Sequence, residues 1–172
     1  DVFYASLPAV IGELIHAQNF YIALRSEDGE RLDFPYSVDA RDLVRQSRTL
    51  GQGLTEYVLR TGQPLLADRA LIQSLEDRGE ARSYGATALI WLGVPLIYDE
   101  RTVGVMVTQS YDHEHSYGKR EQDILTFVSY HIANALQRKR QADSLREANV
   151  ALEERVRERT EALAATNATL RE

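Results

Sequence analysis

The spacing of hydrophobic residues changes along this chain, and the changes predict its secondary structure. Apolar residues in 2–17 recur every three or four positions, as in an amphipathic helix. Residues 19–25 and 32–38 instead alternate between apolar and polar, which is typical of strands, and turn-forming residues 27–30 join them as a hairpin. Pro35 has no N–H for a ladder hydrogen bond, so we expect a sheet edge or a bulge there.

Residues 40–90 separate this hairpin from the next strong strand pattern. Residues 53–60 are predicted to form a short helix, and Gly62 suits the left-handed position after its end. We expect a short extended piece at 64–66 and a second short helix over 69–78.

A second hairpin follows this excursion. Residues 90–97 are apolar on both faces, which favours a buried central strand, and residues 102–110 return as its partner. Gly93 and Gly104 remove side chains where another group must approach the backbone closely. A long helix is predicted to begin near Lys119.

The last part of the chain is predicted to be a coiled coil. Residues 135–172 contain no Gly and no Pro, and apolar residues recur there with a seven-residue period. Asn149 at an a position can fix the register of two parallel strands, whereas Arg159 and Thr166 at d positions weaken the seam. The residues expected to form this dimer seam are Leu145, Asn149, Leu152, Val156, Leu163 and Leu170.

The order of these elements predicts an α+β fold. We expect a central antiparallel sheet of four or more strands with the first and last helices on one face and the 40–90 excursion over the other. A pocket is expected between sheet and excursion, because loops fill space less densely than strands. The expected domains are a globular domain at 1–139 and a parallel coiled-coil helix at 140–172.

Composition narrows the function classes. The net charge is -6 and both signs are interspersed, so we see no footprint of nucleic-acid or membrane contact. No apolar run approaches the ~18–20 residues that span a bilayer. Cysteine is absent, which excludes disulfides, thiolate nucleophiles and Cys-ligated metals, and it fits a cytoplasmic location. Because the chain starts with Asp, we expect it to be an excised fragment.

Four segments resemble a known family, the bacterial GAF domain, over about residues 3–139. They are Gly53–Leu66, Trp91–Ile97, Val103–Val107, and Phe127-Val128 with Ile132-Ala133. The tail Leu152–Thr160 resembles signalling-helix linkers that join GAF or PAS sensors to output domains. Those outputs are typically histidine kinases, diguanylate cyclases or phosphodiesterases.

The resemblance implies about six antiparallel strands, a pocket under the excursion, and a parallel dimer through the first and last helices. Members of the family bind cyclic nucleotides, bilins, haem or other small molecules, and some bind nothing known. The asparagine-lysine-phenylalanine-aspartate-glutamate pattern of mammalian cyclic-nucleotide binders is absent. Cysteine-attached bilins and the cysteine-dependent methionine sulfoxide reductases of this fold are excluded. An unassigned ligand or none remains, and we expect no resident cofactor.

Aromatic and polar residues of the excursion and the central strands are candidates for lining the pocket. They could form an aromatic wall with a few convergent polar groups, suited to a planar ring. The alternative is that the aromatic residues fill the core and the polar groups satisfy loop backbone, as Asp68 would at the start of the 69–78 helix. The candidates are Phe34, Tyr36, Tyr57, Asp68, Tyr84, Trp91 and Gln109.

Histidines offer a weaker alternative. His113 and His115 stand two apart in an acidic loop and could hold a metal or haem, but a solvated turn explains them more simply. His131 on the long helix is interpreted as a packing residue. No catalytic constellation and no metal-ligand spacing emerges, so the chain is not expected to be an enzyme.

These observations favour a regulatory sensor module. It would bind an unidentified small molecule and transmit the signal through a homodimeric coiled coil to an output domain. The alternatives are a ligand-free dimerisation and relay module and, less favoured, a haem or metal sensor. The ligand, the output domain and the sign of regulation are not specified by the residues.

Overall fold

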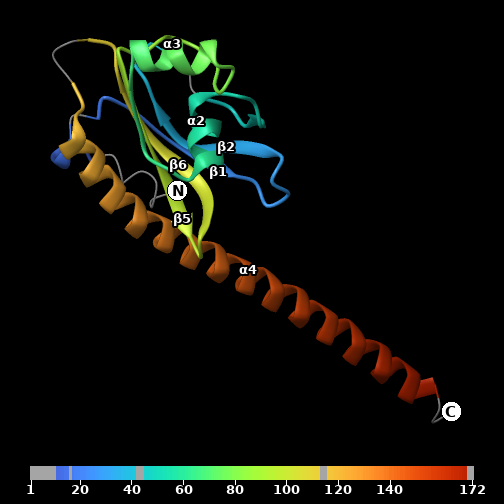
Figure 1. Ribbon diagram of the computed structural model, residues 1–172. Coiled ribbons are helices and arrows are strands. Elements are labelled where there is room, and N and C mark those ends of the chain that lie inside the picture. The colour runs from blue at the N-terminus through green and yellow to red at the C-terminus, as the bar shows by residue number, and fades with distance from the viewer. Residues whose placement is uncertain (1–10, 16, 42–44, 113–115, 170–172) are drawn as a thin grey trace. The chain divides into compact units, whose positions relative to one another are not determined.

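A six-stranded antiparallel sheet organises the globular part of the protein, as expected (Figure 1). The computed structural model describes residues 11–15, 17–41, 45–112 and 116–169. The strand order is β3-β2-β1-β6-β5-β4, so the two predicted hairpins pair through β1 and β6. The elements are β1 Asn19–Arg25, β2 Arg31–Val38, β3 Arg48–Thr49, α2 Leu54–Thr61, β4 Leu65–Asp68, α3 Arg69–Asp77, β5 Ile90–Tyr98, β6 Arg101–Ser110 and α4 Lys119–Thr169.

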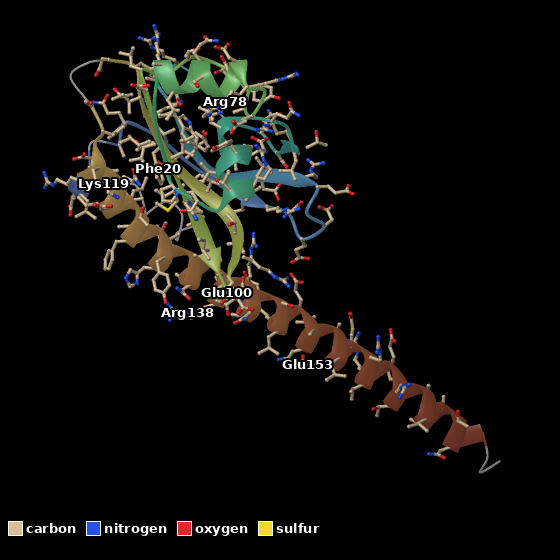
Figure 2. All side chains as sticks on the ribbon, viewed as in Figure 1. Phe20, Arg78, Glu100, Lys119, Arg138 and Glu153 are labelled. Atoms are coloured by element: carbon tan, nitrogen blue, oxygen red, sulfur yellow. The ribbon has the colours of Figure 1, made fainter. Side chains whose placement is uncertain are left out.

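The two faces of the sheet pack against different elements. Tyr21, Trp91 and Val107 point to the face that α2 and α3 cover, where they join the side chains of Val58 and Ile72. The opposite face carries Phe20, Ile22, Leu92, Val94 and Met106, all buried. Figure 2 shows Phe20 inside the unit and Arg78 at its surface. The 40–90 excursion therefore covers one face, as the element order predicted.

Pro35 lies at an irregularity of β2, which confirms the expectation of a bulge. Ile22 of β1 pairs with Tyr36, whereas Leu24 pairs with Asp33, so two residues of β2 lie opposite one of β1. A proline fits such a place because its missing N–H removes no ladder hydrogen bond.

The helix ends in the excursion follow the residues that predicted them. Gly62 adopts φ 64° after α2, and its N–H donates to the carbonyl of Val58 at 2.8 Å. Asp68 caps α3 by accepting a hydrogen bond from the N–H of Leu71 at 2.8 Å. Both ends are closed by local chemistry, which explains why sequence located these helices to within a residue.

Three boundaries differ from expectation. Strand β3 was not predicted, because two residues carry no periodicity. Strand β4 continues past residue 66 to Asp68, which pairs with Ile90. Of the helix expected over 2–17, residues 11–14 are helical, residue 15 is a bend, and residues 1–10 lie outside the described residues.

The chain divides into two compact units, Asp1–Ala133 and Asn134–Glu172, and α4 runs unbroken through both sequences. In the first unit, Leu125 and Ala133 of α4 are buried. In the second, the predicted seam residues Leu145, Leu152, Val156 and Leu163 are 56–64% exposed in the single chain. Leu170 lies outside the described residues. Among those described, no helix is long and apolar enough to cross a membrane.

Candidate functional site

A polar cleft opens between the sheet and the 40–90 excursion, on the sheet face that α2 and α3 cover. Its interior measures about 40 Å³, room for about three water molecules, and the space out to its open mouth, part of it bulk solvent, is about 460 Å³. The cleft is lined by Tyr21, Arg45, Arg48, Gly53, Leu54, Thr55, Glu56, Ile72, Arg82, Ser83, Tyr84, Ala86, Thr87, Ala88, Trp91 and Gln109.

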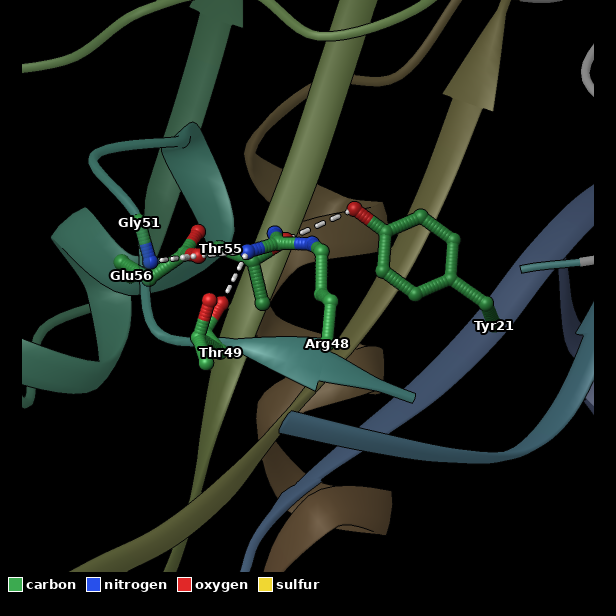
Figure 3. Close-up of polar contacts among 6 residues, drawn as sticks. All are labelled: Tyr21, Arg48, Thr49, Gly51, Thr55 and Glu56. Carbon is green, nitrogen blue, oxygen red and sulfur yellow. Dashed lines mark hydrogen bonds and ion pairs between the residues drawn. The ribbon is translucent and has the colours of Figure 1, made fainter. Parts of the chain in front are cut away.

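An ion pair between Arg48 of β3 and Glu56 of α2 stands at one wall (Figure 3). Glu56 is the third residue of α2, the position from which a carboxylate can reach back to free N–H groups before the helix. Its Oε1 also accepts a hydrogen bond from the N–H of Gly51 at 2.9 Å. The N-cap residue Gly53 supplies no side chain for this task. Glu56 therefore closes the helix start and ties it to the edge strand.

Glu56 is ionised at neutral pH although its side chain is only 4% exposed. Burial by itself would raise the pKa of this carboxyl group, but the hydrogen bond from Arg48, the Gly51 N–H and the charge of Arg48 lower the pKa below its ordinary value. The pKa of Arg48 is raised: burial opposes the charge, and the bond to Glu56 outweighs it. Oε2 of Glu56 has no hydrogen-bond partner among the described residues.

Aromatic side chains form the floor. The hydroxyl of Tyr21 lies 2.8 Å from the hydroxyl of Thr55, and the guanidinium of Arg45 lies 4.1 Å from the ring centre of Tyr21. Burial raises the pKa of the Tyr21 hydroxyl, so it stays neutral. The Trp91 indole packs over Gly93, where any side chain would collide with it. The sequence predicted that another group approaches the backbone closely at Gly93, and that group is the Trp91 indole.

Gln109 also lines the cleft, and a network of hydrogen bonds holds its side chain. Its side-chain amide donates to Asp39 at 2.5 Å and to the hydroxyl of Tyr111 at 2.7 Å. The Tyr111 hydroxyl donates to the same carboxylate at 2.9 Å, and Asn19 accepts from the N–H of Ala40 at 2.8 Å. These bonds fix the start of the excursion to β1 and β6, upstream of Arg45.

Three of the seven predicted pocket residues line the cleft: Tyr84, Trp91 and Gln109. The other four lie elsewhere. The ring of Phe34 packs 5.9 Å from that of Tyr21, and that of Tyr36 packs 6.0 Å from Phe20.

Tyr57 and Asp68 also serve other contacts. The guanidinium of Arg60 lies 5.6 Å from the ring centre of Tyr57, and Asp68 caps α3. The alternative interpretation, in which these groups fill the core or satisfy backbone, accounts for Phe34, Tyr36 and Asp68, whereas Tyr57 packs against an exposed arginine.

Sequence reasoning missed the charged residues of the cleft. These are Arg45, Arg48, Glu56 and Arg82. One signal was available: arginines recur at 41, 45 and 48 in a segment without helical or strand periodicity, in a chain of net charge -6. A run of cations that serves neither a helix face nor a strand face is a candidate for ligand contact.

The histidines do not form a described site. His113 and His115 lie outside the described residues. The His131 ring makes edge-on contacts with Phe127 at 4.7 Å and Tyr130 at 5.5 Å between ring centres, on an exposed face of α4. Among the described residues, no group of three or more His, Asp or Glu side chains is placed to hold a metal ion.

Comparison with known proteins identifies the family of the domain that contains this cleft. The model of the GAF domain family matches residues 5–137. A curated relative, the circadian input-output histidine kinase CikA of Thermosynechococcus vestitus, is 34% identical over 73 residues, which is 42% of this chain. The chain spans about a tenth of the length of that kinase, since the match covers 10% of it.

Solved structures share the fold at low identity. The GAF domain of a phosphoenolpyruvate-protein phosphotransferase from Coxiella burnetii superposes with a TM-score of 0.64 and 16% identity, over 80% of this chain and 82% of that one. Free methionine-R-sulfoxide reductase from Neisseria meningitidis, in complex with its substrate, gives 0.63 and 17%, over 82% and 80%. At such identities the likeness establishes the architecture alone.

Proposed function

The chain belongs to the GAF domain family, and we propose that it senses a small molecule and signals through a dimeric α4. GAF domains are typically sensory and regulatory modules of signalling proteins. The output domain would be the enzyme of a multidomain protein such as a histidine kinase or diguanylate cyclase, acting in the cytoplasm. The open polar cleft carries the ligand-binding half of this proposal.

The cleft is suited to a regulatory ligand because it combines rigid and movable walls. Trp91 and Tyr21 are buried on central strands, whereas Tyr84 is 53% exposed in the segment between α3 and β5. A ligand between them would draw the excursion toward the sheet. It can shift the protein between two states only by binding one of them more tightly.

The transmission half of the proposal depends on α4. Its first part contributes Leu125 and Ala133 to the core of the sensor unit, and the same helix continues without a break through the heptad segment. Phe127 and Tyr130 on α4 are 68% and 63% exposed, as the seam residues are. Apolar side chains repeated on an exposed helix favour a partner helix, and a second copy in parallel supplies the same seam.

The ligand-binding proposal can be tested by thermal shift with a metabolite library that includes neutral, cationic and anionic compounds. Compounds that bind the cleft should raise the melting temperature of the native chain and have no effect on an Ala86→Phe variant, in which a ring fills the cleft. A variant that melts like the native chain but responds equally to every hit would contradict binding in the cleft.

The dimer can be tested by disulfide crosslinking. Because the chain has no cysteine, Leu145→Cys or Leu152→Cys introduces a unique thiol at a predicted seam position. Both variants should form disulfide dimers rapidly on mild oxidation, and Val150→Cys, equally exposed but outside the seam, should not. Equal rates at all three positions would contradict the parallel coil, and ligand-independent rates would count against a change of register.

A ligand-free relay module is the second candidate. The small cleft interior and the Arg48–Glu56 pair across its wall favour it, because side chains already occupy much of the space. In that case no library compound would raise the melting temperature, whereas crosslinking at Leu145 and Leu152 would persist. The reductase chemistry that depends on cysteine is not available to this chain.

A further inference from the structure

One wall of the cleft contains no helix or strand. It is formed by residues 82–87, here called the strap, which lie between α3 and β5. Ala81 before the strap and Ala88 after it are buried, whereas the strap is exposed except for the half-buried Ala86. An exposed segment without regular structure, held between two buried residues, is of the kind that opens locally at low cost in free energy. The strap residues that line the cleft are Arg82, Ser83, Tyr84, Ala86 and Thr87.

Hydrogen bonds hold the chain at both ends of the strap. The N–H of Arg82 donates to the carbonyl of Gln52 at 2.6 Å, and the N–H of Ser83 donates to Oε1 of Glu76 at 2.7 Å. Just beyond the other end, the N–H of Leu89 donates to the last carbonyl of β6 at 2.8 Å. With these bonds intact, the middle of the strap can move while α3 and the sheet stay in place.

The Tyr84 ring closes the strap against two glycines. A Cβ built at Gly53 would lie 3.1 Å from Cδ2 of Tyr84, and a Cβ built at Gly51 would lie 3.2 Å from its hydroxyl oxygen, so the ring runs along both residues. The guanidinium of Arg48 lies 5.5 Å from the ring centre. No hydrogen bond of the Tyr84 hydroxyl is found within the described part of the chain. Tyr84 therefore fastens the strap through its ring.

The closed strap leaves a buried polar atom without a partner. Oε2 of Glu56 would lie 2.7 Å from the same Cβ at Gly53, so this oxygen and the Tyr84 ring together fill the space beside the glycine. Oε2 is buried and has no hydrogen-bond donor among the described residues, which is costly for a carboxylate oxygen. If the ring moved away, water would reach Oε2, and this gain offsets part of the cost of opening.

Gly85 directly follows Tyr84 and has the backbone freedom that a hinge needs. Its φ is 79°, in the left-handed region that glycine occupies without strain and other residues disfavour. Glycine also reaches other backbone regions easily, so a rotation at this residue can carry the Tyr84 ring away from the cleft.

We propose that the strap is a gate of the cleft, shut in this structure, and that the Tyr84 ring must lift from Gly51 and Gly53 before a small molecule reaches the cleft floor. The shut cleft has an interior of about 40 Å³, room for about three waters, so a larger molecule reaches the floor only when the ring moves. The inference rests on the proposed sensor function for what passes the gate, whereas opening itself can be measured without a ligand.

Trp91 reports the opening. It is the only tryptophan in the chain, it lines the cleft and it is 3% exposed. The probe is acrylamide, a neutral quencher that reaches the indole more often when the strap is open. Tyr84→Ala removes the ring and its contact with Arg48, so the bimolecular quenching constant of Trp91 should rise about threefold or more. Tyr84→Phe keeps the ring and should match the native chain.

A second pair of variants tests the hinge. Gly85→Ala places a side chain on a left-handed residue of the shut strap, which disfavours the shut state, so the quenching constant should rise again. Gly79→Ala introduces the same strain at φ 69°, with open space around the added Cβ, but it precedes the buried Ala81. This control should leave the quenching constant unchanged.

Each remaining outcome decides the inference. If Tyr84→Ala is quenched no faster than the native chain, or Tyr84→Phe as fast as Tyr84→Ala, the ring does not fasten the strap and the inference is wrong. Equal rises in the two glycine variants would contradict a hinge at Gly85.

The same measurements separate the gate from the sensor function. Library compounds that raise the melting temperature, together with unchanged quenching in Tyr84→Ala, would contradict the gate and leave the sensor function standing. Faster quenching in Tyr84→Ala, without any compound that binds the native chain or this variant, would support the gate and contradict the sensor function.

Discussion

The indole of Trp91 lies against the backbone of Gly93, two residues along β5 on the same face of the sheet. A Cβ built at Gly93 would come within 2.5 Å of Cζ3 of Trp91, closer than carbon atoms approach in proteins. Alternate residues of a strand share a face, and only glycine lets the ring lie flat over its neighbour. The pair sets the depth of the cleft floor.

Gly93→Ala should therefore destabilise the protein by about 1–3 kcal/mol, because the added methyl group overpacks the floor and lifts the indole. The emission maximum of Trp91 should shift to longer wavelength as the ring gains solvent. Urea unfolding followed by circular dichroism measures the first effect and fluorescence the second. Gly118→Ala, where a Cβ meets Glu121 at an ordinary 3.5 Å, should change neither.

Removal of the α3 cap should lower the free energy of unfolding by less than Gly93→Ala does. Asp68→Ala leaves the N–H of Leu71 without its acceptor and should lower the free energy of unfolding by about 1 kcal/mol. Asp68→Asn retains a side-chain oxygen at that position and should cost only a few tenths of that amount. Equal losses for the two variants in urea unfolding would show that charge rather than the cap hydrogen bond matters.

Stability should depend on pH through Glu56. Its folded pKa lies below the unfolded value of 4.5, so the unfolded chain binds the proton more readily. The stabilisation is fully present above that value and is lost as pH falls through the folded pKa. Urea midpoints should fall from about pH 5 downward, and Glu56→Gln should flatten that slope.

The Glu56→Gln variant should also be less stable than the native chain at neutral pH. Glu56→Gln weakens the bonds to Arg48 and Gly51 and should lower stability by about 1–3 kcal/mol at pH 7. Glu27→Gln, an exposed carboxylate in the first hairpin turn, serves as the control for charge. An undiminished slope in Glu56→Gln would show that other carboxylates dominate the acid transition.

Local chemistry explains what the sequence could predict here. Gly62 and Asp68 close helices with their own backbone neighbours, and 90–97 is apolar on both faces because the strand is central. The place of the cleft was predicted, but its charged residues were not, since Arg48 and Glu56 meet only where a two-residue strand lies beside a helix start. Phe34 and Tyr36 are not among the residues that line the cleft, and the β2 bulge at Pro35 separates them: Phe34 packs on Tyr21, whereas Tyr36 packs on Phe20.

The coil seam in the second unit is expected to be marginal. In the predicted heptad register Arg159 and Thr166 fall at d positions, and the Thr166 hydroxyl donates a hydrogen bond to the carbonyl of Ala162 at 2.9 Å. Neither side chain supplies the apolar knob that a d position packs into its partner. A weak seam is what the signalling proposal requires, because two arrangements of the coil must then differ by only a few kcal/mol.

Replacement of both residues by leucine should strengthen the dimer. Each buried leucine contributes about 1.5–3 kcal/mol, so Arg159→Leu with Thr166→Leu should raise the helix melting temperature and lower the dimer dissociation constant by at least tenfold. Sedimentation equilibrium and circular dichroism of the whole chain measure both. Ala151→Leu with Ala164→Leu adds apolar bulk at positions outside the seam and should do neither. If the two double variants gain equally, the heptad register assigned to α4 is wrong, because only the correct register places residues 159 and 166 against the partner helix.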